Sequence, residues 1–392
     1  MVFSSIVFLF AFLPIVLTVY YVLKPQLRNI FLLIASLFFY YWGEPKFLIV
    51  MVASILWNYL CGIVLNIFID KNRSQRFIER FTLFVGVAVN VGLLFYFKYF
   101  NFSIELLNSI FHCGLAVQNI VLPIGISFFT FQGISYIIDV YRRDVPAQKN
   151  PLKFGMYISL FPQLIAGPIV RYADIEKEIN CRSVTLNDFY QGMVRFVVGL
   201  SKKVIIANTL ANQVDKIFAQ DVTTITQGTA WLGAIMYALQ IYFDFSGYSD
   251  MAIGLGRIFG FTFLENFNLP YIATSVKEFW RRWHISLSTW FRDYVYIPLG
   301  GNRRGNVYFN LLVVFFLTGL WHGASLNFIV WGLWHGLFLI VERILLKREF
   351  RFMRDSAPAW VLLLRRIYTL LVVLIGWVFF RADTLSIAWN YL

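Results

Sequence analysis

Charged residues are scarce in this sequence, which is unusual for a soluble protein of its length. Asp, Glu, Lys and Arg make up 14% of the 392 residues, hydrophobic residues make up 59%, and the mean hydropathy is +0.66. Ordinary soluble domains carry about 25% charged residues. No polar stretch between the apolar segments is long enough to form a soluble domain of its own. The composition therefore predicts a single integral membrane domain over residues 1–392.

Several catalytic and metal-binding patterns are also missing. The three cysteines, Cys61, Cys113 and Cys181, are far apart and form no CxxC pair, which argues against a disulfide framework and a cysteine metal site. None of the four histidines is followed five residues later by Asp, and the sequence has no GxSxG, HExxH or P-loop motif. A serine hydrolase, a zinc protease and an ATP-driven pump all become less probable. We expect neither a metal ion nor a tightly bound cofactor.

The net charge of +13 has a simple explanation in a membrane protein. The basic residues lie in short loops between apolar segments and not along one solvated face, so they indicate membrane orientation and not a nucleic-acid partner. The dense clusters fall at 71–80, 142–153, 277–304 and 342–354. Because cytoplasmic loops are enriched in Lys and Arg, these clusters predict an N-terminus outside the cytoplasm.

Apolar segments predict an all-α polytopic fold with about ten or eleven transmembrane helices plus re-entrant segments. The first segment has no basic n-region and no small-residue cleavage site after it, so we expect a retained span and not a signal peptide. Residues 154–170 carry Pro162, Gly167 and Pro168 and are expected to enter the membrane and return. The expected spans are 5–23, 29–43, 47–67, 81–98, 121–140, 189–207, 229–250, 306–321, 327–343 and 361–380.

Two of these spans, 306–321 and 327–343, are separated by a very short connection and predict a helical hairpin. Gly323 is suited to end the first helix, because glycine tolerates the backbone conformation of a helix C-terminus. Ser325 or Asn327 is suited to cap the second helix.

The pentapeptide GLWHG occurs twice in this hairpin, at 319–323 and 332–336, and places His322 and His335 thirteen residues apart. His322 is expected at the tip of the hairpin, and His335 about 12 Å deeper along the returning helix. Thirteen residues on one helix would also turn the two side chains about 220° apart. The repeat therefore does not predict two ligands of one site.

Ionisable side chains inside membrane spans are costly and by default suggest function. Histidine is the most useful of them, since its ordinary pKa of about 6.5 lets it accept and return a proton near neutral pH. Asp244 and Asp250 are equally compatible with a water-lined cavity and with structural hydrogen bonds. The candidates are His284, His322, His335, Asp244 and Asp250.

The residues around each histidine favour different interpretations. His322 is equally compatible with catalysis and with a buried hydrogen bond at a helix end. For His335 a structural role is favoured, because glycines beside it suggest close helix packing and Glu342 lies on the same side of the helix. The basic neighbours of His284 by themselves favour a role as an anchor at the membrane interface. His112 is expected to be an ordinary loop residue.

The sequence resembles the membrane-bound O-acyltransferase family, and within it the bacterial branch typified by the alginate O-acetyltransferase membrane subunit. A more distant similarity is to the membrane protein of teichoic-acid D-alanylation. Seven segments carry the resemblance in order: MVFSSIVFLF at the start, LPIGISFFTFQGISYIIDVYR at 122–142, LFPQLIAGPIVR at 160–171, YFDFSGYSDMAIGLG at 242–256, EFWRRWHISLSTWFRDYVYIPLGGNR at 278–303, GLWHGAS at 319–325 and GWVFFRA at 376–382.

The resemblance implies a role for three histidines. His322 corresponds to the catalytic histidine, and His284 to a second functionally important polar position that we expect to be its partner in the active site. His335 corresponds to a second WHG, which is expected to be structural. Relatives usually continue past the segment that ends at Ala382 with a further span or two, so C-terminal spans are expected to be missing here.

The resemblance further implies transfer of acetyl from a cytoplasmic thioester, with acetyl-CoA as the expected donor, to an acceptor outside the bacterial plasma membrane. Expected partners are an SGNH-type acetyltransferase and an envelope polysaccharide, alginate or a similar exopolysaccharide. Peptidoglycan O-acetylation, D-alanyl transfer, a transporter and a scaffold are the alternatives. The basic loop would attract the donor phosphates through Lys277, Arg281, Arg282, Arg303 and Arg304.

Overall fold

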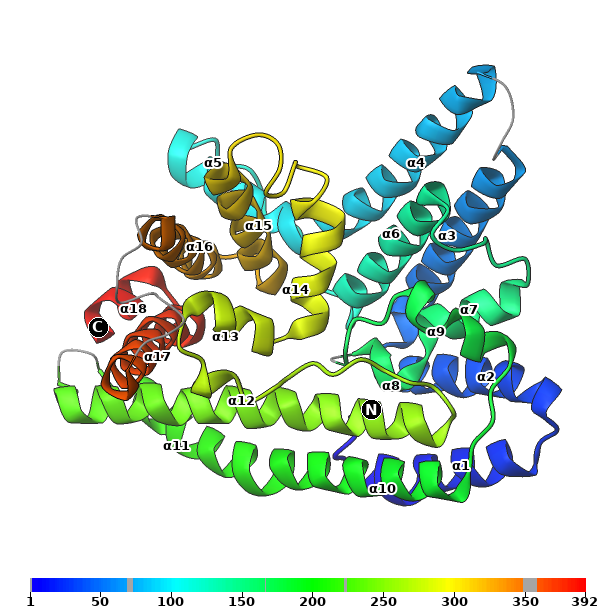
Figure 1. Ribbon diagram of the computed structural model, residues 1–392, viewed down its shortest axis with the longest axis horizontal. Coiled ribbons are helices and arrows are strands. Elements are labelled where there is room, and N and C mark those ends of the chain that lie inside the picture. Colours follow the sequence, from blue (N-terminus) through cyan, green and yellow to red (C-terminus); the bar gives the residue numbers. More distant parts are fainter. Residues whose placement is uncertain (1, 69–72, 166, 222–223, 348–357) are drawn as a thin grey trace. The chain divides into compact units, whose positions relative to one another are not determined.

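The computed structural model describes residues 2–68, 73–165, 167–221, 224–347 and 358–392, and the regular elements in these ranges are all helices (Figure 1). The all-α prediction is confirmed for this part of the chain. Lys71 and Asn72 of the first basic cluster and residues 348–354 of the last lie outside it. All ten expected spans coincide with helices. Four stretches are long and apolar enough to cross a membrane, Pro45–Phe68, Arg76–Phe111, Leu326–Leu346 and Ala359–Arg381, and they indicate a membrane protein.

The chain forms two compact units. Unit 1 comprises Met1–Leu200 and Tyr248–Leu264, and unit 2 comprises Ser201–Gly247 and Glu265–Leu392. The single membrane domain expected over 1–392 stays a prediction.

Unit 1 has a core rich in aromatic side chains. The rings of Phe3, Phe8, Phe39 and Phe161 are buried against one another, with centroids 4.9–6.4 Å apart. Its helices are η1 (Phe8–Phe12), α1 (Leu13–Val22), α2 (Pro25–Gly43), α3 (Leu48–Phe68), α4 (Arg73–Leu94), α5 (Phe100–Phe111), α6 (Ile126–Arg142), α7 (Pro151–Ser159), α8 (Phe161–Leu164), α9 (Tyr172–Asn180) and most of α10 (Leu186–Ser201).

The segment expected to be re-entrant is a broken helix in unit 1. Helix α7 ends at Ser159, and α8 covers only four residues, all of them buried. The amide of Phe161 at the break donates a hydrogen bond of 3.1 Å to the hydroxyl of Ser36. Protein groups thus satisfy the backbone where the helix is interrupted.

Unit 2 contains the two GLWHG segments. Its elements are η4 (Lys202–Ala207), α11 (Asn208–Phe218), the first part of α12 (Gln227–Ile258), α13 (Val276–Arg282), α14 (Ile285–Phe291), η6 (Arg292–Tyr296), α15 (Val307–His322), α16 (Leu326–Lys347), α17 (Ala359–Arg381) and α18 (Leu385–Tyr391). Figure 1 shows α15 and α16 together in this unit, and α16 also packs against α17 and α13.

The hairpin of α15 and α16 is confirmed, and its glycines explain how closely the two helices pack. A Cβ atom at Gly319 would overlap the carbonyl oxygen of Phe328, and one at Gly332 would overlap that of Phe315. Gly323 follows α15 as predicted. Of the two predicted caps, Ser325 directly precedes the first residue of α16, whereas Asn327 lies inside the helix and its side-chain amide donates a hydrogen bond of 2.6 Å to the carbonyl of Ala382.

Candidate active site

His322 is the last residue of α15 and is half-buried among aromatic rings. Its imidazole centroid lies 4.8 Å from the ring of Trp321, 4.9 Å from Trp331 and 5.0 Å from Phe380. These rings come from α15, α16 and α17, so three helices hold the side chain at the tip of the hairpin. The predicted position at the hairpin tip is confirmed.

His284 is fully buried, and its surroundings do not fit an interfacial anchor. Its Nδ1 lies 3.2 Å from Oδ1 of Asn266, an oxygen that also accepts hydrogen bonds from the amide (3.2 Å) and hydroxyl (2.9 Å) of Ser286. Because that oxygen is an acceptor, Nδ1 carries the proton and Nε2 presents a lone pair. Burial lowers the pKa of His284 to about 3, so the imidazole is neutral near pH 7.

The backbone of His284 is also constrained. Its φ of 45° places it in the left-handed region, which side chains other than glycine rarely adopt. The next amide, of Ile285, is held by a 2.9 Å hydrogen bond to the carbonyl of Asn266. This constraint starts α14 and orients the imidazole.

The structure brings His284 and His322 to the same indole. The ring of Trp321 lies 5.7 Å from the ring of His284 and 4.8 Å from that of His322, and both contacts are edge-on. The expected pairing of a histidine from the 277–304 segment with His322 therefore has a geometric basis. Whether either residue is catalytic stays a prediction.

His335 is fully buried and lies nearer to His322 than helix spacing suggested. The ring of Trp331 contacts His322 at 4.9 Å and His335 at 5.3 Å. The predicted separation of about 12 Å counted only depth along the returning helix, whereas Trp331, four residues before His335 on α16, contacts both imidazoles. The returning helix therefore places Trp331 against both imidazoles.

The predicted basic loop is partly helical, which corrects the sequence interpretation. Residues Val276–Arg282 form α13, and the hydroxyl of Ser275 accepts a 3.0 Å hydrogen bond from the amide of Glu278 as its N-cap. The buried carboxylate of Glu342 accepts two further hydrogen bonds, from the amides of Val276 (2.6 Å) and Lys277 (3.1 Å). A residue on α16 thus completes the start of α13, which sequence spacing did not reveal.

The cations expected to bind donor phosphates differ in their environments. Lys277 and Arg281 are exposed. Arg282 forms a 2.9 Å ion pair with Glu278 and donates a 3.1 Å hydrogen bond to the carbonyl of Asn268. Two of the three cations of α13 are therefore on the surface, and the third holds the local backbone. Arg303 and Arg304 are exposed in the segment that precedes α15.

A pocket of about 200 Å³ lies beside these cations and is otherwise largely apolar. Along α15 its wall residues recur every three or four positions, and His322 follows Thr318 at the same spacing. The pocket thus runs along the face of α15 that ends at His322. Its wall is formed by Lys277, Trp280, Arg281, Leu287, Ser288, Phe291, Leu311, Val314, Phe315, Thr318 and Leu339.

Asp244 and Asp250 are each paired with a cation. In unit 2, the Asp244 carboxylate lies 2.7 Å from Nζ of Lys203. In unit 1, Asp250 lies 2.8 Å from the guanidinium of Arg195. These pairs support the structural interpretation that the sequence left open.

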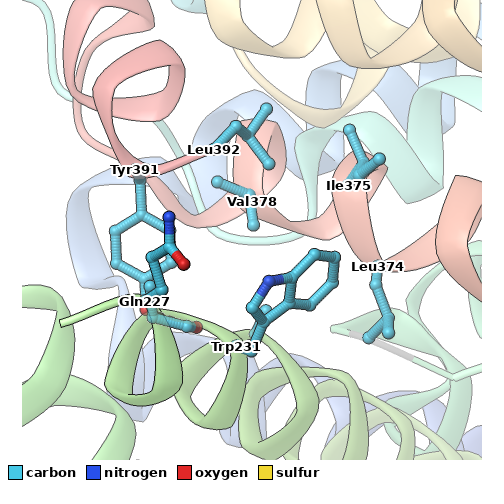
Figure 2. A pocket seen from close by; sticks show the side chains of 9 residues that line it. Gln227, Trp231, Leu374, Ile375, Val378, Tyr391 and Leu392 are labelled. Atoms are coloured by element: carbon cyan, nitrogen blue, oxygen red, sulfur yellow. Dashed lines mark hydrogen bonds between the residues drawn. The ribbon is translucent and has the colours of Figure 1, made fainter.

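Two other pockets have no His, Cys, Asp, Glu, Lys or Arg side chain in their walls. One of about 160 Å³ is formed by α12, α17 and α18, with Trp231, Leu374 and Tyr391 among its walls (Figure 2). The other, of about 560 Å³, lies in unit 1 between α3 and α4. Neither contains a group able to move a proton near pH 7.

Fold and site together define a helical membrane protein with a half-buried histidine one helical turn beyond the wall of a largely apolar pocket that carries two cations. That arrangement suits the transfer of a group from an anionic donor. The chain belongs to the membrane-bound O-acyltransferase family, whose sequence pattern matches residues 93–381, more than half of the chain. It is therefore an O-acyltransferase, and not a transporter or a scaffold.

Three relatives illustrate the range of the family. The chain is 49% identical over 396 residues to a probable alginate O-acetylase of Pseudomonas putida, covering 99% of this chain and 79% of the relative. It is 37% identical over 424 residues to a peptidoglycan O-acetyltransferase of Helicobacter pylori, covering 99% and 78%. It is 32% identical over 231 residues to a teichoic acid D-alanyltransferase of Bacillus subtilis, covering 54% and 57%.

Proposed function

We propose that this enzyme transfers acetyl from a cytoplasmic thioester, acetyl-CoA, to a hydroxyl of a polysaccharide on the other side of the membrane. The observation that carries the proposal is the pocket along α15, which has exposed cations in its wall and whose last wall residue on this helix, Thr318, lies one turn before His322. Lys277 and Arg281 supply the charge that donor phosphates require. Arg282, paired with Glu278, holds the backbone beside α13 through its hydrogen bond to the carbonyl of Asn268.

In this mechanism His322 acts as general base. Its imidazole takes the proton of the acceptor hydroxyl while the hydroxyl oxygen forms a bond to the thioester carbonyl carbon. The carbon–sulfur bond breaks, the new ester leaves with the acceptor, and the thiolate receives the proton from the imidazolium. His284 is neutral and separated from His322 by Trp321, so we assign it the role of a positioning residue.

The membrane arrangement belongs to the same proposal. Ten or eleven helices cross the bacterial plasma membrane with the N-terminus outside, and residues 154–170 enter it without crossing. The break between α7 and α8 and the four long apolar helices support this topology. It places Lys277 and Arg281 on the cytoplasmic side, where acetyl-CoA is available, and His322 toward the opposite side.

The acceptor we propose is alginate or a similar exopolysaccharide, reached with the help of an SGNH-type acetyltransferase outside the membrane. The support is the 49% identity to a probable alginate O-acetylase over nearly the whole chain, against 37% to a peptidoglycan O-acetyltransferase. Comparing the O-acetyl groups on exopolysaccharide and on peptidoglycan, in cells with and without this chain, identifies the acceptor. Loss from peptidoglycan alone would contradict the proposed acceptor.

The catalytic assignment is tested with His322→Asn. We expect polysaccharide O-acetylation to fall at least a hundredfold, since general-base catalysis contributes about 10²–10⁴ in rate. His112→Asn is the matched control, because His112 is exposed at the end of α5 and its φ of 52° suits asparagine. Acetate released by mild alkali is measured, with membrane levels of both variants compared. Wild-type acetylation by a well-expressed His322→Asn protein would refute the assignment.

A further inference from the structure

Three buried side chains beside the pocket have polar atoms without hydrogen-bond partners among the residues that the structure describes. These atoms are Nε1 of Trp280, Nε1 of Trp331 and both ring nitrogens of His335. His335 and Trp331 are fully buried, and Trp280 is 8% exposed. The three rings contact one another with centroid distances of 5.1, 5.3 and 5.6 Å. Four unsatisfied polar atoms thus belong to a single cluster of rings.

Such a cluster needs a physical reason. Buried polar groups are almost always hydrogen-bonded, and an unsatisfied one weakens the folded state. An apolar side chain at each of the three positions would avoid that penalty. The remaining surroundings are apolar or aromatic, since His335 also lies against Phe279 and the backbone of Gly376. Packing alone therefore does not account for two indoles and an imidazole at this place.

The cluster lies between the pocket and His322. Trp280 is part of the pocket wall and also contacts the ring of His335, 5.1 Å away. Trp331 contacts the ring of His322 at 4.9 Å. A donor that extends from the exposed cations toward His322 therefore passes these three side chains.

We infer that Trp280, Trp331 and His335 form a polar subsite that binds the amide and thioester carbonyl groups in the linear arm of the acyl donor. The two indole N–H groups donate to carbonyl oxygens, and the imidazole, whose Nε2 lies against Gly376, bonds to the arm through Nδ1. This inference rests on the proposed function, and it assigns His335 a binding role in place of the structural one expected from sequence.

Binding is measured on the full-length protein in detergent, in a His322→Asn background that prevents turnover. The probes are radiolabelled acetyl-CoA, acetyl-pantetheine, which has the arm without the nucleotide, and adenosine 3′,5′-bisphosphate, which has nucleotide phosphates without the arm. The variants are His335→Phe, Trp331→Phe and Trp280→Phe. Trp334→Phe is the matched control, because its indole lies on the same helix as Trp331 but donates a 2.8 Å hydrogen bond to Val372.

We expect His335→Phe to raise the Kd of acetyl-CoA and of acetyl-pantetheine about tenfold, the effect of losing one hydrogen bond. The Kd of the bisphosphate should not change. The thermal midpoint should stay equal or rise, because an apolar ring replaces unsatisfied nitrogens. A merely structural histidine would not combine weaker donor binding with undiminished stability. Trp331→Phe and Trp280→Phe should weaken binding of the same two probes, and Trp334→Phe should not.

The outcomes separate the two proposals. If the parent His322→Asn protein binds neither acetyl-CoA nor the bisphosphate, the proposed donor is wrong. If the parent protein binds acetyl-CoA and all four ring variants bind it equally well, only the subsite is overturned. If His335→Phe does not fold, the two tryptophan variants decide the question, and a Kd equal to that of Trp334→Phe would overturn the inference.

Discussion

Replacing Glu342 with alanine should destabilise the protein strongly, although the residue is not assigned to the chemistry. Its carboxylate is 2% exposed and accepts the amides of Val276 and Lys277 at 2.6 and 3.1 Å. Hydrogen bonds to charged groups contribute about 1.5–3 kcal/mol each, so the loss of both predicts about 3–6 kcal/mol. Glu342→Gln keeps an acceptor oxygen and should cost about half as much.

The loss should also reach the proposed donor site. Glu342, on α16, caps the first amides of α13, and α13 carries the pocket residues Lys277, Trp280 and Arg281. We therefore expect weaker acetyl-CoA binding together with a lower thermal midpoint, measured by unfolding in detergent. Domains are stable by about 5–15 kcal/mol, so 3–6 kcal/mol is readily detected.

Asp215→Ala is the control for the loss of a carboxylate. Asp215 pairs with Arg381 at 2.7 Å, but its side chain is 64% exposed. Exposed ion pairs contribute little, so the midpoint should not change measurably. If Glu342→Ala unfolds at the same temperature as Asp215→Ala, the capping role is refuted.

Two further substitutions test the site and the hairpin. Burial lowers the pKa of His284 to about 3, so between pH 6.5 and 3 this imidazole is protonated in the unfolded state and neutral in the folded state. The free energy of unfolding should therefore fall as the pH decreases from about 6.5 toward 3. This residue contributes at most about 1.4 kcal/mol per pH unit to the slope of the free energy of unfolding against pH. His284→Asn should remove that contribution when unfolding is measured across this pH range. An unchanged slope would contradict the burial of a neutral His284. Gly332→Ala should destabilise the hairpin by about 1–3 kcal/mol, because the added methyl overlaps the carbonyl of Phe315. Gly228→Ala, with open space around its Cβ position, should be neutral or slightly stabilising, and equal midpoints for the two variants would refute the close packing.

Local sequence predicted the helices well. Apolar segments of sufficient length must form helices in a membrane, because no water is available to satisfy the backbone. The hairpin was also predictable, since Gly323 lies between two apolar segments and Gly332 allows close approach. The four helices that satisfy length and composition confirm the membrane class, whereas the number that cross the bilayer stays a prediction.

The candidate site was less predictable because its contacts join distant segments. Helix α13 was expected to be a loop, because its seven residues are strongly charged. The helix was missed because its first amides are capped by Glu342, which lies more than sixty residues away in the sequence. The burial of His284 depends on Asn266 and on aromatic rings from other helices, and its basic neighbours pointed instead to a membrane interface.

The GLWHG repeat shows the same difference between local features, which the sequence predicts, and contacts between distant segments, which it does not. The sequence by itself determined that two histidines lie in an apolar helical hairpin, because composition and glycine positions are local properties. Only the tertiary structure decided what surrounds each imidazole. His322 lies half-buried at the tip, whereas His335 lies fully buried with Trp280 and Trp331. The reason is physical: α13 and α17 pack against α16, and the distances between these separate segments are not contained in residue spacing along one helix.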